Sequence, residues 1–309
     1  MGWLKITLGF VFSMVVFGLL VFYWFMPFNS IEFISPPPSN GNFSLNSSLM
    51  PEMQFYPNMR YPSYNITYSL DSNSCSLKKM DDAKTAFGML QNLTVLNFYQ
   101  VDSNADISVT CDNKVVINEN YFVAGEGGPV NITKTEDFDV IEKGKVLLLR
   151  DSNCQTPNIA VHEILHALGF KHSTNPGNIM YPVTSCDETI GQEIPELIDN
   201  LYSIPSYPDL AFDSASAIIQ GRYLDTNVTV SNVGLKDTPD AAYLLIYANG
   251  YNVDSEVVPL IPLGGGLTFS LKNVWVPAAN VDELTYVLAT NFTEISQKNN
   301  QVKLEIKKY

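Results

Sequence analysis

The sequence predicts an α+β domain with a mixed sheet and three helices, followed by an all-β sandwich and preceded by one transmembrane helix. Three observations lead to this prediction. A continuous apolar run, ITLGFVFSMVVFGLLVFYWFMPF, occupies residues 6–28. Near residue 207 the sequence pattern changes from one typical of mixed helices and strands to short runs in which apolar and polar residues alternate. The length of 309 residues suits about two folded domains at roughly 150 residues each.

Composition and charge narrow the range of functions. Hydrophobic residues make up 46% of the chain, which excludes general disorder. There are 18 Lys and Arg against 32 Asp and Glu, a net charge of −14. Because such a charge repels phosphate backbones, nucleic acid is excluded as a partner.

The apolar run predicts a signal-anchor transmembrane helix over residues 1–28. It is long enough to cross a hydrocarbon core of about 30 Å, and it lacks the short core and cleavage site of a removable secretory signal. A buried core helix is rarely so long and so uniformly apolar. Lys5 precedes the run and the next basic residue is Arg60, so we expect a cytoplasmic N-terminus and an extracellular remainder.

The next residues, 29–58, are rich in Pro, Ser and Asn and include three consecutive prolines from Pro36. This composition predicts a semi-rigid stalk. The α+β domain is then expected at 59–206 and the sandwich at 207–309.

Local patterns predict the elements of the α+β domain in order. Apolar residues at helical spacing, from Met80 to Leu90, predict a helix over 77–93. Two more helices are expected at 159–170 and 188–202. Strands are expected at 64–70, 93–101, 106–111, 114–125 and 144–150.

The last third of the chain consists of short alternating runs separated by Gly, Pro and Asn-Gly turns. This pattern predicts a sandwich with strands at 224–234, 242–250, 255–263, 267–276, 283–290 and 301–308.

The cysteines suit an oxidising compartment, because they form an even set: Cys75, Cys111, Cys154 and Cys186. Four cysteines allow three pairings, which the sequence alone does not decide. We favour Cys75 with Cys111 and Cys154 with Cys186, because each pair would tie a segment to its own end of one domain. Seven N-x-S/T triplets are compatible with glycosylation.

All three histidines of the chain lie in one segment, HEILHALGFKH, at residues 162–172. His162 and His166 are four residues apart and so share one face of a helix, with Glu163 beside them. Gly169 can adopt the positive φ that turns the chain and brings back His172 as a third ligand. Three imidazoles with one open position are typical of a catalytic zinc site.

With NIMYP at residues 178–182, this segment resembles the matrixins, the matrix-metalloproteinase-like branch of the metzincins. Ser173 after the third histidine, ITYSL at 66–70 and ADISVTC at 105–111 add to the resemblance. It covers roughly residues 59–203. It implies a metzincin-like fold and a zinc-dependent metalloendopeptidase acting on proteins or peptides.

The resemblance also implies residue roles. Zinc would be held by His162, His166 and His172, with Glu163 as general base and Met180 in a Met-turn beneath the metal. We expect the substrate to lie along an edge strand near residues 123–127. One catalytic zinc is expected. Calcium can bind acidic residues such as Glu136, Asp137 and Asp139, although an acidic solvated loop explains them more simply.

The C-terminal region resembles the CARDB-like, immunoglobulin-like adhesion sandwiches, through DTNVTVSNVG at 225–234 and EISQKNNQVKLEI at 294–306. Such a sandwich can bind a cell-surface polymer or serve as a spacer. We therefore expect a membrane-anchored extracellular zinc endopeptidase. The alternative is a surface adhesion protein with a vestigial metal site.

Overall fold

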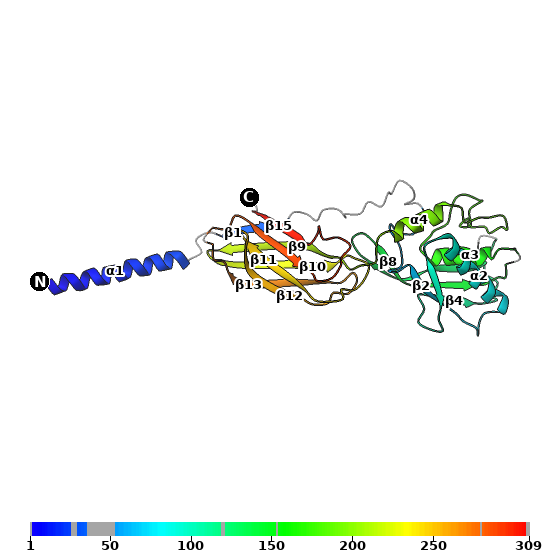
Figure 1. Ribbon diagram of the computed structural model, residues 1–309, viewed down its shortest axis with the longest axis horizontal. Helices are drawn as coiled ribbons and strands as arrows, with labels where there is room; N and C mark the ends of the chain where they lie inside the picture. Colours follow the sequence, from blue (N-terminus) through cyan, green and yellow to red (C-terminus); the bar gives the residue numbers. More distant parts are fainter. Residues whose placement is uncertain are drawn as a thin grey trace. The chain divides into compact units, whose positions relative to one another are not determined.

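The computed structural model describes residues 2–25, 30–35, 53–118, 121–152, 154–278 and 280–306. The chain forms two compact units (Figure 1). The sandwich unit comprises Met1–Asn40, Leu210–Asn232 and Thr238–Tyr309. The α+β unit comprises Gly41–Asp209 and Val233–Asp237.

The α+β unit is built on a five-stranded sheet with the strand order β3-β2-β4-β8-β7. The first four strands are parallel to their neighbours, and β7 runs antiparallel to β8 at the edge. Its elements are β2 (Asn65–Leu70), α2 (Leu77–Leu93), β3 (Asn97–Gln100), β4 (Ile107–Cys111), β5 (Ile117–Asn118), β6 (Tyr121–Phe122), β7 (Gly125–Lys134), β8 (Asp139–Leu148), α3 (Asn158–Ala167) and α4 (Glu193–Tyr202). The predicted mixed sheet and three helices of this domain are therefore present.

Helix α2 has the bounds that its apolar spacing predicts. The Ser76 side chain accepts a hydrogen bond from the Lys79 N–H and so caps the N-terminus. Ala83, Phe87 and Leu90 are buried along one face. This face belongs to a single core that also includes the inner side chains of β2, β4 and α3.

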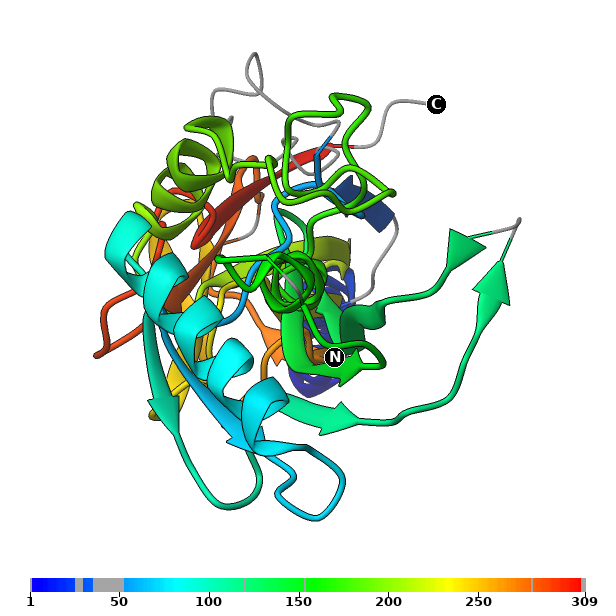
Figure 2. The ribbon, with the colours of Figure 1, turned by 90° about the vertical axis from the view of Figure 1, so that its right-hand side faces the viewer.

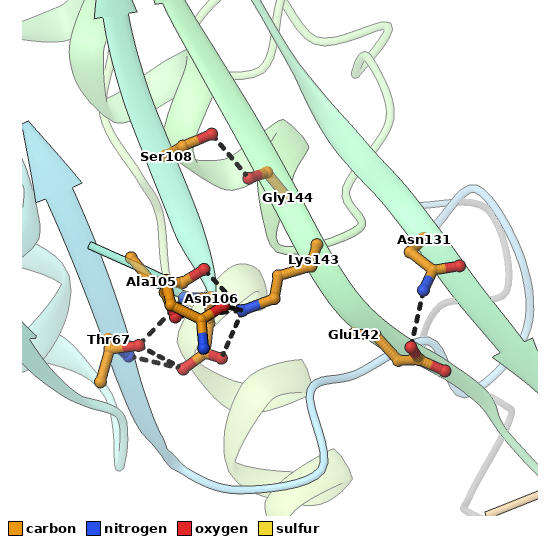
Figure 3. A network of polar contacts seen from close by, with 9 residues as sticks. Thr67, Ala105, Asp106, Ser108, Asn131, Glu142, Lys143 and Gly144 are labelled. Atoms are coloured by element: carbon orange, nitrogen blue, oxygen red, sulfur yellow. Dashed lines mark hydrogen bonds and ion pairs between the residues drawn. The ribbon is translucent and has the colours of Figure 1, made fainter. Parts of the chain in front are cut away.

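A polar network fixes the register of three neighbouring strands (Figure 3). The Asp106 carboxylate, just before β4, accepts hydrogen bonds from the backbone N–H and the hydroxyl of Thr67 on β2, at 2.8 and 2.7 Å. The Lys143 ammonium on β8 donates to the Ala105 carbonyl at 2.8 Å and lies 3.8 Å from the same carboxylate. These contacts hold β2, β4 and β8 at a fixed offset.

Two predicted elements of the α+β unit are wrong in detail. The helix expected from residue 188 begins only at Glu193, because Gly191 has a positive φ of 71° and Thr189 pairs with Asn178. The strand expected over 114–125 is divided into β5 and β6, which pair antiparallel as a two-stranded ribbon. Strand β7 was not expected over its full length, since its glycines and proline weaken a strand pattern.

The sandwich unit contains one eight-stranded antiparallel sheet with the order β12-β11-β14-β15-β1-β9-β10-β13. Buried side chains of β9 and β10 pack with those of β11 and β14 in one core, so two halves of the sheet face each other. The strands are β1 (Ser30–Ile34), β9 (Leu210–Gln220), β10 (Tyr223–Asn232), β11 (Ala242–Ala248), β12 (Tyr251–Val258), β13 (Gly266–Trp275), β14 (Leu284–Ala289) and β15 (Gln301–Ile306). The likeness to CARDB or immunoglobulin domains stays a prediction.

Strand β1 corrects the predicted stalk. Residues 30–34 lie between β9 and β15 and pair antiparallel with both. Phe33 is 1% exposed in the core of the sandwich unit. A five-residue strand in a proline-rich neighbourhood gave too short a pattern to be recognised. Residues 36–52, the middle of the predicted stalk, lie outside the described residues.

Helix α1 (Gly2–Phe25) comes before β1. Within the part of the chain that the structure describes, no helix has the length and apolar character needed to cross a membrane. The membrane span expected from the sequence is therefore not confirmed.

Candidate metal centre and active site

Helix α3 carries His162, Glu163 and His166, which are 5%, 6% and 7% exposed. Nearly every side chain of this ten-residue helix is buried, since it packs against β7, β8 and α2. The four-residue spacing places both imidazoles on the same face, and their ring centroids are 4.6 Å apart. The helix thus presents two nitrogen ligands at one spot, as the sequence predicts.

Gly169 ends the helix and redirects the chain. Its φ is 98°, and its N–H donates to the His166 carbonyl at 3.0 Å. Only glycine adopts this conformation without strain. The turn brings back His172, whose Nε2 lies 3.2 Å from the Nε2 of His166.

The three histidines fit a tetrahedral metal ion. Their ligand atoms all lie within 4.8 Å of one another. Ligands held 2.0–2.1 Å from a tetrahedral zinc are separated by about 3.3 Å, close to the distance between the two Nε2 atoms. Three nitrogen donors also match the ligand set of catalytic zinc sites.

Backbone carbonyls orient two of the rings. The Nδ1 of His162 lies 2.6 Å from the Ile179 carbonyl, and the Nδ1 of His166 lies 2.7 Å from the Phe170 carbonyl. Because a carbonyl only accepts, each Nδ1 carries the proton and each Nε2 keeps a free lone pair. Burial lowers the pKa of both histidines to about 4, so the rings are neutral at neutral pH, as metal ligation requires.

Met180 belongs to a turn that contacts this cluster. It is fully buried, and its N–H donates to the Asn178 side chain at 2.9 Å. Its carbonyl accepts from the N–H of Ser173, which directly follows the third histidine. The preceding carbonyl, that of Ile179, is the one that orients His162. The turn therefore supports two of the histidines through its backbone.

Glu163 is held against two glycines of β7. A Cβ added to Gly125 would lie 2.7 Å from the Glu163 Cγ, and one added to Gly127 would lie 2.1 Å from its carbonyl oxygen. Burial, followed by the negative charge of Glu126, raises the pKa of Glu163 to about 8, although a hydrogen bond from the Gly127 backbone opposes the shift. The result is an unusually basic carboxyl group on the same helix as His162 and His166.

Residues 53–55 also contribute to the site, although the sequence assigned them to a stalk. The Phe55 N–H donates to the Gly169 carbonyl at 2.9 Å, and the Lys171 N–H donates to the Met53 carbonyl at 3.0 Å. The Phe55 ring stacks on His166 with centroids 5.8 Å apart. This segment therefore pairs with the chain between the second and third histidines.

Both favoured disulfides are confirmed. Cys75 bonds to Cys111, and Cys154 bonds to Cys186. The first joins the segment before α2 to the end of β4. The second joins the segment before α3 to the segment after Met180, and so closes the chain around the histidines.

Calcium binding stays unsupported. Among the described residues, the three histidines are the only group of three or more candidate side chains whose ligand atoms converge. Glu136, Asp137 and Asp139 do not form such a group.

Sequence reasoning missed the roles of Gly125, Gly127 and Phe55. Two alternating glycines in a strand often mark a close approach of another backbone, and this signal was available in the segment GEGG. The approach of Phe55 to His166 left no signal, because it depends on strand-like pairing between distant segments.

Comparisons with known proteins agree with this geometry. Residues 60–202 match the family model described as Matrixin. Human matrix metalloproteinase-26 is 31% identical over 131 residues, which make up 38% of this chain and 46% of that protein. The chain thus spans under half of the length of this relative. The matches support a matrixin-like metallopeptidase domain in the α+β unit.

Proposed function

We propose that the chain is a zinc-dependent endopeptidase that hydrolyses peptide bonds in proteins or peptides. The observation that carries the proposal is the convergence of three histidine nitrogens, two of them on the same helix as the buried Glu163. The Matrixin match over the same residues adds support from an independent source.

In this proposal His162, His166 and His172 hold the metal. A zinc ion at this place would supply Lewis-acid chemistry, by polarising the scissile carbonyl and making a water more acidic. The carbonyls of Ile179 and Phe170 keep the lone pairs of two rings directed at the ion. The first of these carbonyls belongs to the turn that contains Met180.

Glu163 acts as the general base and then as the general acid. Its carboxylate takes a proton from the attacking water while the water oxygen bonds to the carbonyl carbon. It then delivers this proton to the amine nitrogen as the carbon–nitrogen bond breaks. In the metal-free chain, burial raises the pKa of the Glu163 carboxyl group above its ordinary value. Gly125 and Gly127 leave the space that its position requires.

Strand β7 is the proposed edge along which a substrate lies. Among the described strands it pairs only with β8, so its other side is an edge of the sheet. An extended peptide can add to such an edge by backbone hydrogen bonds. Glu163 touches β7 at Gly125, so a peptide on this edge passes close to the base.

The location is a further part of the proposal. The apolar run at residues 6–28 and its flanking charges favour a single-pass anchor with the α+β unit outside the cell. Flotation of the full chain with lipid vesicles tests the anchor. Chain that stays at the bottom of the gradient contradicts it.

The decisive experiment is cleavage of a fluorogenic peptide library by the zinc-loaded full chain. We expect cleavage by the wild type and by Glu196→Gln, which removes an exposed charge of α4. We expect none from Glu163→Gln or after chelation. A chain that binds one zinc per molecule and cuts nothing contradicts the proposal and favours the adhesion alternative.

A further inference from the structure

A two-stranded ribbon projects from the α+β unit and carries exposed apolar side chains. Strands β5 and β6 form it, together with Val115, Val116 and Val123; we call it the apolar ribbon. Figure 2 shows it standing clear of the neighbouring elements. Val115, Ile117 and Phe122 are 65%, 64% and 60% exposed.

These three side chains share one face. Ile117 and Phe122 are direct cross-strand partners, and Val115 lies two residues before Ile117. A bond from the Val123 N–H to the Val116 carbonyl, at 2.9 Å, continues the pairing to this point. An isolated two-stranded ribbon is marginally stable, and contiguous exposed apolar groups typically mark an interaction surface. Folding stability therefore does not explain why these three apolar side chains are exposed.

The base of the apolar ribbon is fixed beside the proposed active site. The Ala124 carbonyl accepts hydrogen bonds from the N–H groups of Leu149 and Arg150, each at 3.0 Å. The Arg150 guanidinium carbon lies 4.3 Å from the centre of the Phe122 ring. Gly125, which touches Glu163, comes three residues after Phe122. At most about 11 Å of extended chain therefore separates Phe122 from Gly125, the residue in contact with the proposed base.

We propose that the apolar ribbon is a docking surface for an extended apolar segment of a polypeptide substrate, outside the residues next to the cut bond. This inference rests on the proposed peptidase function. The ribbon continues directly into β7, so a chain lying along that edge can continue onto Val115, Ile117 and Phe122. Unfolded proteins expose apolar segments of this kind, whereas folded proteins bury them. The ribbon accordingly favours unfolded substrates over short peptides.

The test compares two substrates of the zinc-loaded full chain: a fluorogenic hexapeptide and fluorescently labelled casein, an unfolded protein. The test variant is Val115→Ser, Ile117→Ser and Phe122→Ser together. The matched control replaces three exposed apolar residues elsewhere in the α+β unit, Leu77, Val95 and Tyr99, with serine. We expect the KM for casein to rise about tenfold in the test variant, with kcat unchanged and hexapeptide cleavage within twofold of wild type. The control should match wild type on both substrates.

The other outcomes contradict either the docking surface or the peptidase function. An unchanged KM for casein, or an equal rise in the control, refutes the docking surface while hexapeptide cleavage leaves the peptidase function intact. No hexapeptide cleavage by wild type refutes the proposed function itself. If the triple variant fails to fold, Ile117→Thr keeps a strand-forming residue and should still raise the KM for casein about twofold; no rise refutes the inference.

Discussion

Replacing Gly169 with alanine should destabilise the α+β unit by about 2–5 kcal/mol. At a φ of 98° a side chain costs about 1–2 kcal/mol. The new Cβ would also lie 2.7 Å from the Cγ and 2.8 Å from the Sδ of Met59, which is fully buried. Overpacking of this kind costs about 1–3 kcal/mol.

The matched control is Gly88→Ala. Gly88 lies in the middle of α2, and no heavy atom lies within 4 Å of an added Cβ. Alanine in an open helix interior should stabilise the unit by about 1 kcal/mol. The two variants make the same chemical change with opposite expected signs.

Scanning calorimetry of the metal-free full chain measures both effects. We expect the transition temperature of the α+β unit to fall by about 5–15 °C in Gly169→Ala and to rise by about 2–4 °C in Gly88→Ala. The transition temperature of the sandwich unit should not change. Zinc binding should weaken only in Gly169→Ala, because His172 follows this turn. A Gly169→Ala protein with wild-type stability and zinc affinity would refute the argument.

Three other predictions follow from the structure. In metal-free protein burial raises the pKa of Glu163 to about 8, so above about pH 4.5 the folded state holds a proton that the unfolded state has released. The lowered pKa of His162 and His166, about 4, acts with the opposite sign up to about pH 6.5, so we expect the fall in stability that Glu163 causes between about pH 6.5 and 8. Glu163→Gln should remove this slope in urea titrations at several pH values. Replacing Cys75 and Cys111 with serine should cost about 4 kcal/mol in the same titrations, from the entropy of a loop with a sequence separation of 36. Phe33→Ala should reduce the free energy of unfolding of the sandwich unit by about 3–5 kcal/mol, seen as a lower transition temperature in calorimetry, whereas the same change in a free stalk would leave it unaltered.

The histidines show what spacing can predict. The interval of four residues on a helix, and a glycine that permits a turn, place all three ligands without knowledge of the remaining fold. The bounds of α2 were equally accessible, because its apolar spacing and the Ser76 cap act within a few residues. Local physics determines these features, so the sequence shows them directly.

Features that depend on distant pairing were not accessible. Strand β1 is a strand because β9 and β15 lie on either side of it, both more than 170 positions away in the sequence. Phe55 reaches His166 only through the pairing of its segment with Gly169 and Lys171. Composition alone made both segments resemble a stalk, since prolines and asparagines dominate around them.

The placement of β1 has a consequence for proteolytic processing. The α+β unit is an insertion between two adjacent strands of one sheet, because the chain leaves the sandwich unit after β1 and returns to it at β9. A single nick in residues 36–52 would cut the polypeptide without freeing either piece, since β1 would remain hydrogen-bonded to β9 and β15. Such a nick should appear on a denaturing gel as two fragments that still migrate together in native chromatography. Separation of both intact units from helix α1 would instead need a cut before Ser30.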